Sequence, residues 1–218
     1  EQAAAYRKKL VEQVAETDDA LLEKYLDKGD LPDGDIIAGL KHGTLGGGLL
    51  PVLCGSPVRN MGIQPLLEMV LTCLPSPAEH ARIVQIKGKD PKTGNEITRK
   101  PAADESLAAI VFKTIIDPFA GKLSLIRVLS GTLKADSTVY NASKQTREKI
   151  GSLFHVQGKK QVSAQSLTAG QIGAAAKLKD TLTGETLCSE QHPILLEFAK
   201  FADPVMSYAI EPMSRGDE

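Results

Sequence analysis

The stretch that decides the fold is LAAIVFKTIIDPFAGKLSLIRVLSGTL, residues 107–133. It holds two runs of apolar and β-branched residues, Leu107–Ile116 and Leu123–Leu129, separated by Asp117-Pro118-Phe119. Such runs bounded by turn residues predict two strands joined by a tight turn. An Asp can accept a hydrogen bond from the backbone ahead of it, and a Pro fixes φ at the turn. The stretch therefore predicts an antiparallel hairpin.

Shorter runs of the same kind surround this hairpin and are separated by Gly, Asp and Asn. A polar hairpin tip is expected at Lys89–Asn95. Many short strands at this spacing are typical of a closed antiparallel β-barrel. We therefore predict a barrel domain over residues 78–203, with further strands at Ile83–Ile86, Thr138–Asn141, Lys149–Val156 and Gln171–Lys177.

The first third of the chain has a different spacing of apolar residues. Apolar residues at helical spacing predict a helix over residues 3–14, a second before Gly29 and a short third that ends at Gly43. Leu49–Cys54 predicts a buried strand, and Gly62–Leu74 a helix that tolerates a Pro in its first turn. Pro75-Ser76-Pro77 is a stiff linker. We expect residues 1–77 to form one α/β unit that ends there.

The predicted strand stops at Gly55-Ser56-Pro57, and a helix follows. In open α/β sheets, ligands bind just beyond the carboxyl ends of strands. Backbone N–H groups of such a small-residue turn can approach a flat base closely. Gly55, Ser56 and Pro57 are therefore candidate ligand-binding residues, although from the residues alone a plain strand-to-helix turn without a ligand explains them better.

The composition is that of an ordinary globular protein of 218 residues with a net charge of −1. This charge excludes a global basic field, so any nucleic-acid contact must come from a local patch. Aromatic residues make up 4% and Trp is absent, which argues against a stacking platform for single strands. The candidate patch is on two predicted hairpins and comprises Lys144, Arg147, Lys149, Lys159 and Lys160. A solvated barrel surface explains it equally well.

Several kinds of site are absent from the sequence. The cysteines Cys54, Cys73 and Cys188 are widely spaced, and we expect them to be small buried thiols. No His has a Cys or His partner at ligand spacing, so we expect no metal site. There is no phosphate-loop motif, and no apolar run approaches the roughly 18 residues of a membrane span.

Read in order, segments along nearly the whole chain resemble bacterial elongation factor G. Residues 14–26 and 51–77 resemble the helical stretch and the end of its GTPase domain. Five further segments resemble its second domain, and residues 204–212 resemble the opening of its third. The sequences that carry the resemblance are VAETDDALLEKYL, PVLCGSPVRNMGIQPLLEMVLTCLPSP, FK with DPFAGKL and RVLSGTL, KLKD with TGETL, and PVMSYAIEP.

The resemblance implies an α/β remnant of a P-loop GTPase domain, then the barrel, then the start of a third domain at residues 204–218. It implies a cytoplasmic parent protein that binds GTP or GDP with Mg²⁺ and acts on the ribosome through small-subunit RNA, with no membrane or DNA partner. The chain begins without Met inside a helical pattern, so we expect an excised piece without catalytic residues, bound nucleotide or metal.

The sequence departs from the family where Pro57 replaces the Ala of a Gly-Ser-Ala turn that contacts guanine. Because Pro has no N–H, one hydrogen bond to the base would be lost, or the Ser56 or Val58 amide would replace it. Arg59, Met61, Leu129, Gln171 and Ala176 also differ from the residues usual in the family, and together these changes indicate a divergent, second-copy form.

Two kinds of alternative stay open. Within the same superfamily, a tetracycline-type ribosome protection protein or a peptide release factor GTPase would share the barrel. From a different class, the chain could be a non-enzymatic module that binds RNA or protein.

Overall fold

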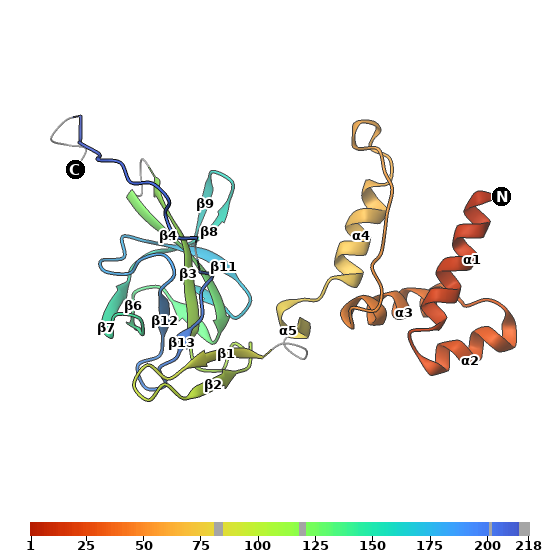
Figure 1. Cartoon of the computed structure of the whole chain (residues 1–218), viewed down its shortest axis with the longest axis horizontal. Helices are drawn as coiled ribbons and strands as arrows, with labels where there is room; N and C mark the ends of the chain where they lie inside the picture. The colour runs from red at the N-terminus through yellow and green to blue at the C-terminus, as the bar shows by residue number, and fades with distance from the viewer. Residues whose placement is uncertain (81–84, 118–120, 201, 214–218) are drawn as a thin grey trace. The chain divides into compact units, whose positions relative to one another are not determined.

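The computed structural model describes residues 1–80, 85–117, 121–200 and 202–213 (Figure 1). The chain forms two compact units, which divide between Gln85 and Ile86. The first unit is helical and the second is built of strands. The predicted run Ile83–Ile86 and the turn Asp117-Pro118-Phe119 lie partly outside the described residues.

The helical unit begins with three helices that pack on one another. They are α1 (Gln2–Ala15), α2 (Asp19–Lys28) and α3 (Asp33–Leu45). Asp18 caps α2, because its Oδ1 accepts the N–H groups of Ala20 and Leu21 at 2.9 and 3.3 Å. The third helix is longer than predicted and ends two residues after Gly43. The buried side chains of this unit are Val11, Val14, Ala15, Leu31, Ile36, Leu40 and Cys73.

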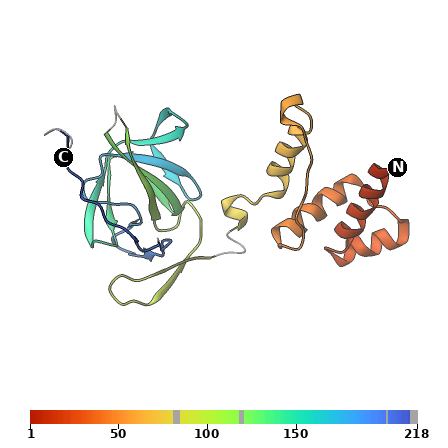
Figure 2. The same cartoon turned by 45° about the horizontal axis from the view of Figure 1, so that its top comes forward.

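The predicted strand Leu49–Cys54 is wrong, because this segment forms no strand. It is extended and runs beside α4 (Ile63–Cys73), as Figures 1 and 2 both show. Leu50 and Val52 are 89% and 90% exposed instead of buried. A strand needs a neighbour for its N–H and C=O groups, and the described residues offer none. The helix predicted at Gly62–Leu74 is confirmed by α4.

The linker Pro75-Ser76-Pro77 leads into one further turn of helix, α5 (Pro77–His80). Ser76 and Glu79 form a capping box, in which the Ser76 N–H and hydroxyl both donate to Glu79 Oε2, at 3.0 and 2.9 Å. Lys41 of α3 donates to Glu79 Oε1 at 2.9 Å. These contacts, led by the Lys41 hydrogen bond, lower the pKa of Glu79 to about 2. The start of α5 is thereby fastened to α3.

The second unit contains thirteen strands in the described residues, all paired antiparallel. The eight-stranded sheet has the order β7-β6-β12-β3-β4-β11-β8-β9, and smaller sheets are β13-β1-β2 and β10-β5. The strands are β1 (Ile86–Lys89), β2 (Glu96–Arg99), β3 (Ala108–Asp117), β4 (Gly121–Ser130), β5 (Thr132–Lys134), β6 (Ser137–Asn141), β7 (Thr146–Ile150), β8 (Leu153–Gln157), β9 (Lys160–Ala164), β10 (Ser166–Thr168), β11 (Ile172–Ala176), β12 (Thr186–Cys188) and β13 (Leu195–Leu196).

The long hairpin predicted from residues 107–133 is confirmed. β3 and β4 pair from Ala108 opposite Ser130 to Asp117 opposite Gly121. Their inward side chains, among them Val111 and Ile126, supply much of the core. The predicted single run Lys149–Val156 divides into β7 and β8 at Gly151-Ser152.

The sheet curls around this core (Figure 2). Over the described residues no ladder joins its two edge strands, β7 and β9. The antiparallel fold is therefore as predicted, while the strand pairing does not show the closed cylinder that the sequence led us to expect. A side chain of β7, Glu148, instead binds the segment that follows β11.

Candidate functional site

The turn at Gly55-Ser56-Pro57 is a small closed loop held by its own backbone. The Ser56 N–H donates to the Met61 carbonyl at 2.9 Å, and the Met61 N–H donates back to Ser56 at 3.1 Å. Between them lies a single turn of 3₁₀-helix, η1 (Pro57–Arg59). Pro57 suits its first position, where no backbone donor is needed.

Glycine is required where this loop closes on itself. Gly62 has φ +76°, and a Cβ there would lie 2.8 Å from the Cys54 carbonyl oxygen. A Cβ at Gly55 would lie 2.9 Å from the Met61 carbonyl oxygen. The backbone approach therefore excludes larger residues at both positions.

This geometry limits which N–H groups of the turn can meet a ligand. Pro57 has none, and the Ser56 N–H is already bonded to Met61. Val58 is 98% exposed, and its N–H has no acceptor within the described residues. Of the two amides expected to replace the missing donor, Val58 is available and Ser56 is not. Contact of this turn with a base stays a prediction.

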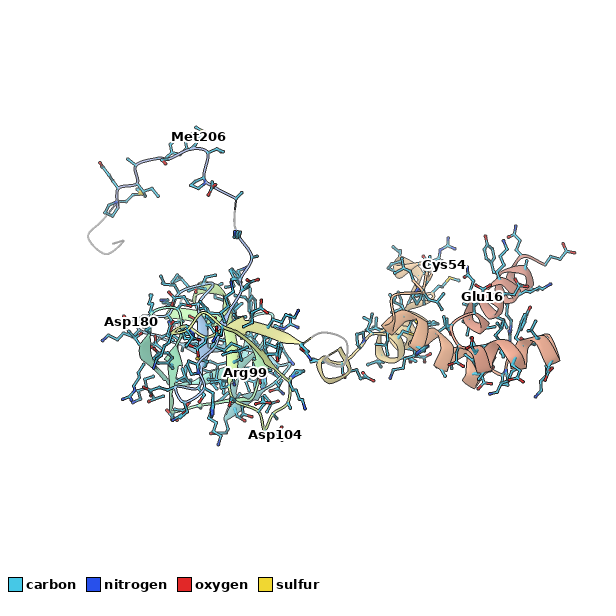
Figure 3. All side chains as sticks on the ribbon, turned by 60° about the horizontal axis from the view of Figure 1, so that its bottom comes forward. Glu16, Cys54, Arg99, Asp104, Asp180 and Met206 are labelled. Atoms are coloured by element: carbon cyan, nitrogen blue, oxygen red, sulfur yellow. The ribbon has the colours of Figure 1, made fainter. Side chains whose placement is uncertain are left out.

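Cys54 stands just before the turn, and the prediction that it is buried is wrong, because its side chain is exposed (Figure 3). Cys73 and Cys188 are buried as expected. The exposure of Cys54 follows from the missing neighbours of the extended segment around it. Burial raises the pKa of the Cys188 thiol, so this residue is an inert part of the barrel core.

An apolar groove of about 850 Å³ lies between α1 and the extended segment. Its apolar lining includes Tyr6 and Leu10 of α1, Leu40 of α3, and Leu50 with Val52 of the extended segment, and Arg7, Lys9 and Gln13 add polar atoms. Tyr6 is 73% exposed. Contiguous apolar surface of this kind marks a place where another part of a protein packs.

Two of the five predicted basic contacts are already paired within the barrel. Arg147 donates Nε and Nη2 to the Glu190 carboxylate at 2.9–3.1 Å, which raises the pKa of Arg147. Lys144 forms an ion pair with Glu185 at 3.3 Å and also donates to the Asp180 carbonyl. These two charges are therefore largely compensated.

The other three, Lys149, Lys159 and Lys160, have no ion pair among the described residues. Lys149 lies on β7, and Lys159 and Lys160 at the turn between β8 and β9. These two hairpins are at opposite ends of the strand order and point apart in Figure 1. The predicted cluster is thus two separate basic surfaces.

A buried carboxylate on β7, which the sequence analysis missed, binds the segment after β11. Glu148 is 3% exposed. Its carboxylate accepts the N–H groups of Lys179, Asp180 and Thr181 at 2.9–3.0 Å, and the Thr181 hydroxyl at 2.8 Å. Burial by itself would raise the pKa of Glu148, but these donors together lower it below the ordinary value. Asp180 marks the bound segment in Figure 3.

A second layer of polar side chains supports this carboxylate. Asn141 donates to the Thr181 hydroxyl at 3.1 Å and to Glu185 at 2.8 Å. A sequence signal for Glu148 existed, because it is in phase with buried Ile150 at the two-residue spacing of a strand.

Two further kinds of feature are absent from the described residues. Within them, no three His, Cys, Asp or Glu side chains gather as a metal site. Nor does any helix in the described part of the chain have the length and apolar character needed to cross a membrane.

Comparison with known proteins relates this barrel to one family. Residues 106–190 match the family model described as elongation factor G domain 2. The chain is also similar to a crystal structure of a protein from Thermus thermophilus, with 27% sequence identity and a TM-score of 0.70. The match covers 98% of this chain and 29% of the Thermus chain, so the present chain spans less than a third of that protein's length.

Proposed function

We propose that this elongation factor G-like chain, whose residues 106–190 are a second domain of that family, works as part of a translational GTPase on the ribosome. The observation that carries the proposal is the family match of the barrel, together with a similarity to one solved structure over nearly the whole chain. In this role the barrel docks on the small ribosomal subunit, and its movement with the nucleotide domain drives translocation of tRNA and mRNA.

The helical unit is then the last part of a P-loop GTPase domain. Its extended segment 49–54 has backbone groups without partners and apolar side chains in the open. A parallel sheet beside that segment would pair its backbone and fill the apolar groove against α1. We assign this sheet to the same full-length protein.

In that full-length protein, GTP or GDP binds with its base against the turn at Gly55-Ser56-Pro57. The Val58 N–H is the donor this turn offers to the base. The chain contains no phosphate-loop motif, so the phosphates and Mg²⁺ are held by other residues of the whole protein. The chain by itself is then inactive toward GTP.

In the barrel, the Glu148 carboxylate of β7 binds the backbone of the segment after β11. Residues 204–213 carry exposed apolar side chains and no helix or strand. We assign residues 204–218 to the start of a third domain.

Sedimentation with isolated ribosomal subunits tests the proposal. We expect the purified chain to pellet with small subunits and not with large ones, and to be released as salt rises, because phosphate contacts dominate. Lys149→Glu should weaken pelleting. The matched control carries Lys9→Glu, an exposed lysine of the helical unit, and should pellet normally. Equal pelleting with both subunits, or with neither, would contradict ribosomal docking through the barrel.

A further inference from the structure

A hollow of the barrel surface lies beside Lys149 and has a volume of about 420 Å³. It is open at the point where β7 turns into β8 and β11 ends. This volume falls within the roughly 300–1,000 Å³ of small-ligand sites. It is lined by Lys149, Gly151, Ser152, Phe154, Ala176 and Lys177.

Lys177 has an unusual backbone for its residue type. It is one of four non-glycine residues with positive φ in the described chain, at +57°. The others are Asn60 and Asp136, residue types that tolerate this conformation, and Gln145. A lysine gains nothing from it, and a glycine would adopt it without steric cost.

The fold requires this backbone turn but does not require a lysine to make it. After Lys177 the chain turns so that Leu178 enters the core and residues 179–181 reach Glu148. The Lys177 N–H also donates to the Lys122 carbonyl at 2.9 Å. All of these contacts use the backbone or the next residues. None of these contacts uses the lysine side chain, and strained residues cluster at functional sites, so Lys177 is a candidate for such a site.

The charge of the pocket is uncompensated. Lys149 and Lys177 are exposed, and neither has an ion pair among the described residues. No residue that lines the pocket is acidic. Lys144 and Arg147 on the same hairpin are by contrast each bound to a carboxylate. Two unpaired ammonium groups at the rim of one pocket favour an anion there.

Phe154 gives the pocket an aromatic wall. It lies on β8 opposite Ala174 and Ser163, and its side chain is half-buried. Proteins hold unpaired nucleotides by stacking the base on an aromatic ring while Lys or Arg neutralises the phosphates. A free phosphate would use the two lysines but not the aromatic wall.

We propose that this pocket binds one unpaired nucleotide of an RNA, with its phosphate between Lys149 and Lys177 and its base against Phe154. The proposal rests on the proposed function, because it specifies which part of an RNA the barrel meets. Lys159 and Lys160 do not line this pocket, although they belong to the hairpin of β8, the strand that carries Phe154.

Fluorescence anisotropy with the full chain and a labelled single-stranded oligoadenylate tests the pocket. The oligoadenylate has about twelve nucleotides, which matches the length of ordinary single-strand sites. We expect Lys177→Gly to weaken binding about tenfold and to reduce the slope of log affinity against log salt by about 0.7. The same variant should unfold at an equal or higher temperature than the parent, because glycine relieves the strained backbone. Phe154→Leu should also weaken binding about tenfold.

Controls separate this pocket from general surface charge. Lys159→Ala and Lys160→Ala should each change affinity less than about twofold, and a blunt-ended RNA duplex should bind more weakly than the single strand. Unchanged affinity in Lys177→Gly or Phe154→Leu would overturn the pocket while leaving ribosomal docking intact. Equally tight binding of AMP would overturn the assignment to RNA. Absence of any binding to RNA and to small subunits would remove the proposed function as well.

Discussion

Pro57 has two opposite effects at the same position. It suits the first residue of η1, so it stabilises the turn by limiting the unfolded chain. It also removes an N–H from the part of the turn proposed to face the base. The structure adds that the neighbouring Ser56 N–H is bonded to Met61 and cannot take over. Nucleotide binding therefore loses one hydrogen-bond donor, the N–H of residue 57.

In the full-length protein, Pro57→Ala is expected to tighten guanine nucleotide binding about threefold to tenfold, because one hydrogen bond of ordinary strength is restored. It should also lower the free energy of unfolding by about 0.5 kcal/mol, because a proline is lost. Titration calorimetry with GDP measures the first effect, and denaturant unfolding the second.

Val58→Ala is the matched control for that substitution. It keeps its N–H and removes a side chain that is almost fully exposed, so nucleotide affinity should be unchanged. Equal affinity of the Pro57→Ala variant and the parent would mean that an N–H at position 57 does not hydrogen-bond the base.

At the scale of elements, one side chain of β7 accepts the first backbone N–H groups of the segment between β11 and β12 that follow Leu178. Residues 179–181 donate three backbone N–H groups to Glu148, and no strand ladder holds them. Glu148→Gln replaces one acceptor oxygen by a donor that faces these N–H groups. We expect a loss of about 3 kcal/mol in the free energy of unfolding, measured with urea.

Protonation of Glu148 in acid should destabilise the parent chain, as Glu148→Gln does. The pKa of Glu148 is lowered in the folded state, so its stabilisation is complete above the unfolded value of about 4.3 and is lost as pH falls through the lower folded value. The control is Glu190→Gln, which removes an exposed partner of Arg147 and should cost less than about 1 kcal/mol. A stability difference between parent and Glu148→Gln that does not shrink in acid would contradict this account.

Elements differ in how well the sequence predicts them. The hairpin β3–β4 and helix α4 were predictable, because each has a long apolar pattern and clear turn residues. β5, β10 and β13 are two or three residues long, and no alternation can develop over that length. Glu148 was missed because an acidic residue in a strand reads as exposed, whereas its donors come from a segment more than thirty residues away in sequence.

At the scale of the whole molecule, the two units differ in how complete their packing is. The barrel core consists of fully buried side chains such as Leu133, Ile150 and Leu153. The helical unit leaves Leu50, Val52 and much of α4 in the open. The apolar run Leu49–Cys54 predicted a strand, but strand formation depends on neighbours that the run itself cannot specify. For this reason the strand and the burial predicted for Leu49–Cys54 are wrong, whereas the turn predicted after it is present.

Hydrogen exchange on the isolated chain should show this difference directly. Amides of residues 50–54 should exchange at nearly the rate of an unfolded chain, because none of them donates to the described protein. Amides in the centres of β3 and β4 should exchange slowest, since their ladder is long and buried. In the full-length protein the 50–54 amides should become protected; if they stay fast there, the proposed sheet does not cover them.

Pro51 in the middle of this exposed segment has a practical consequence. In an extended chain, alternate N–H groups point to opposite sides. Pro51 therefore removes a hydrogen-bond donor from one edge of the segment and leaves the donors of the other edge in place. Two copies of the isolated chain can add strand to strand through the intact edge, whereas growth of a longer stack needs both edges. In concentrated solution the isolated chain should therefore form dimers and be slow to form fibres.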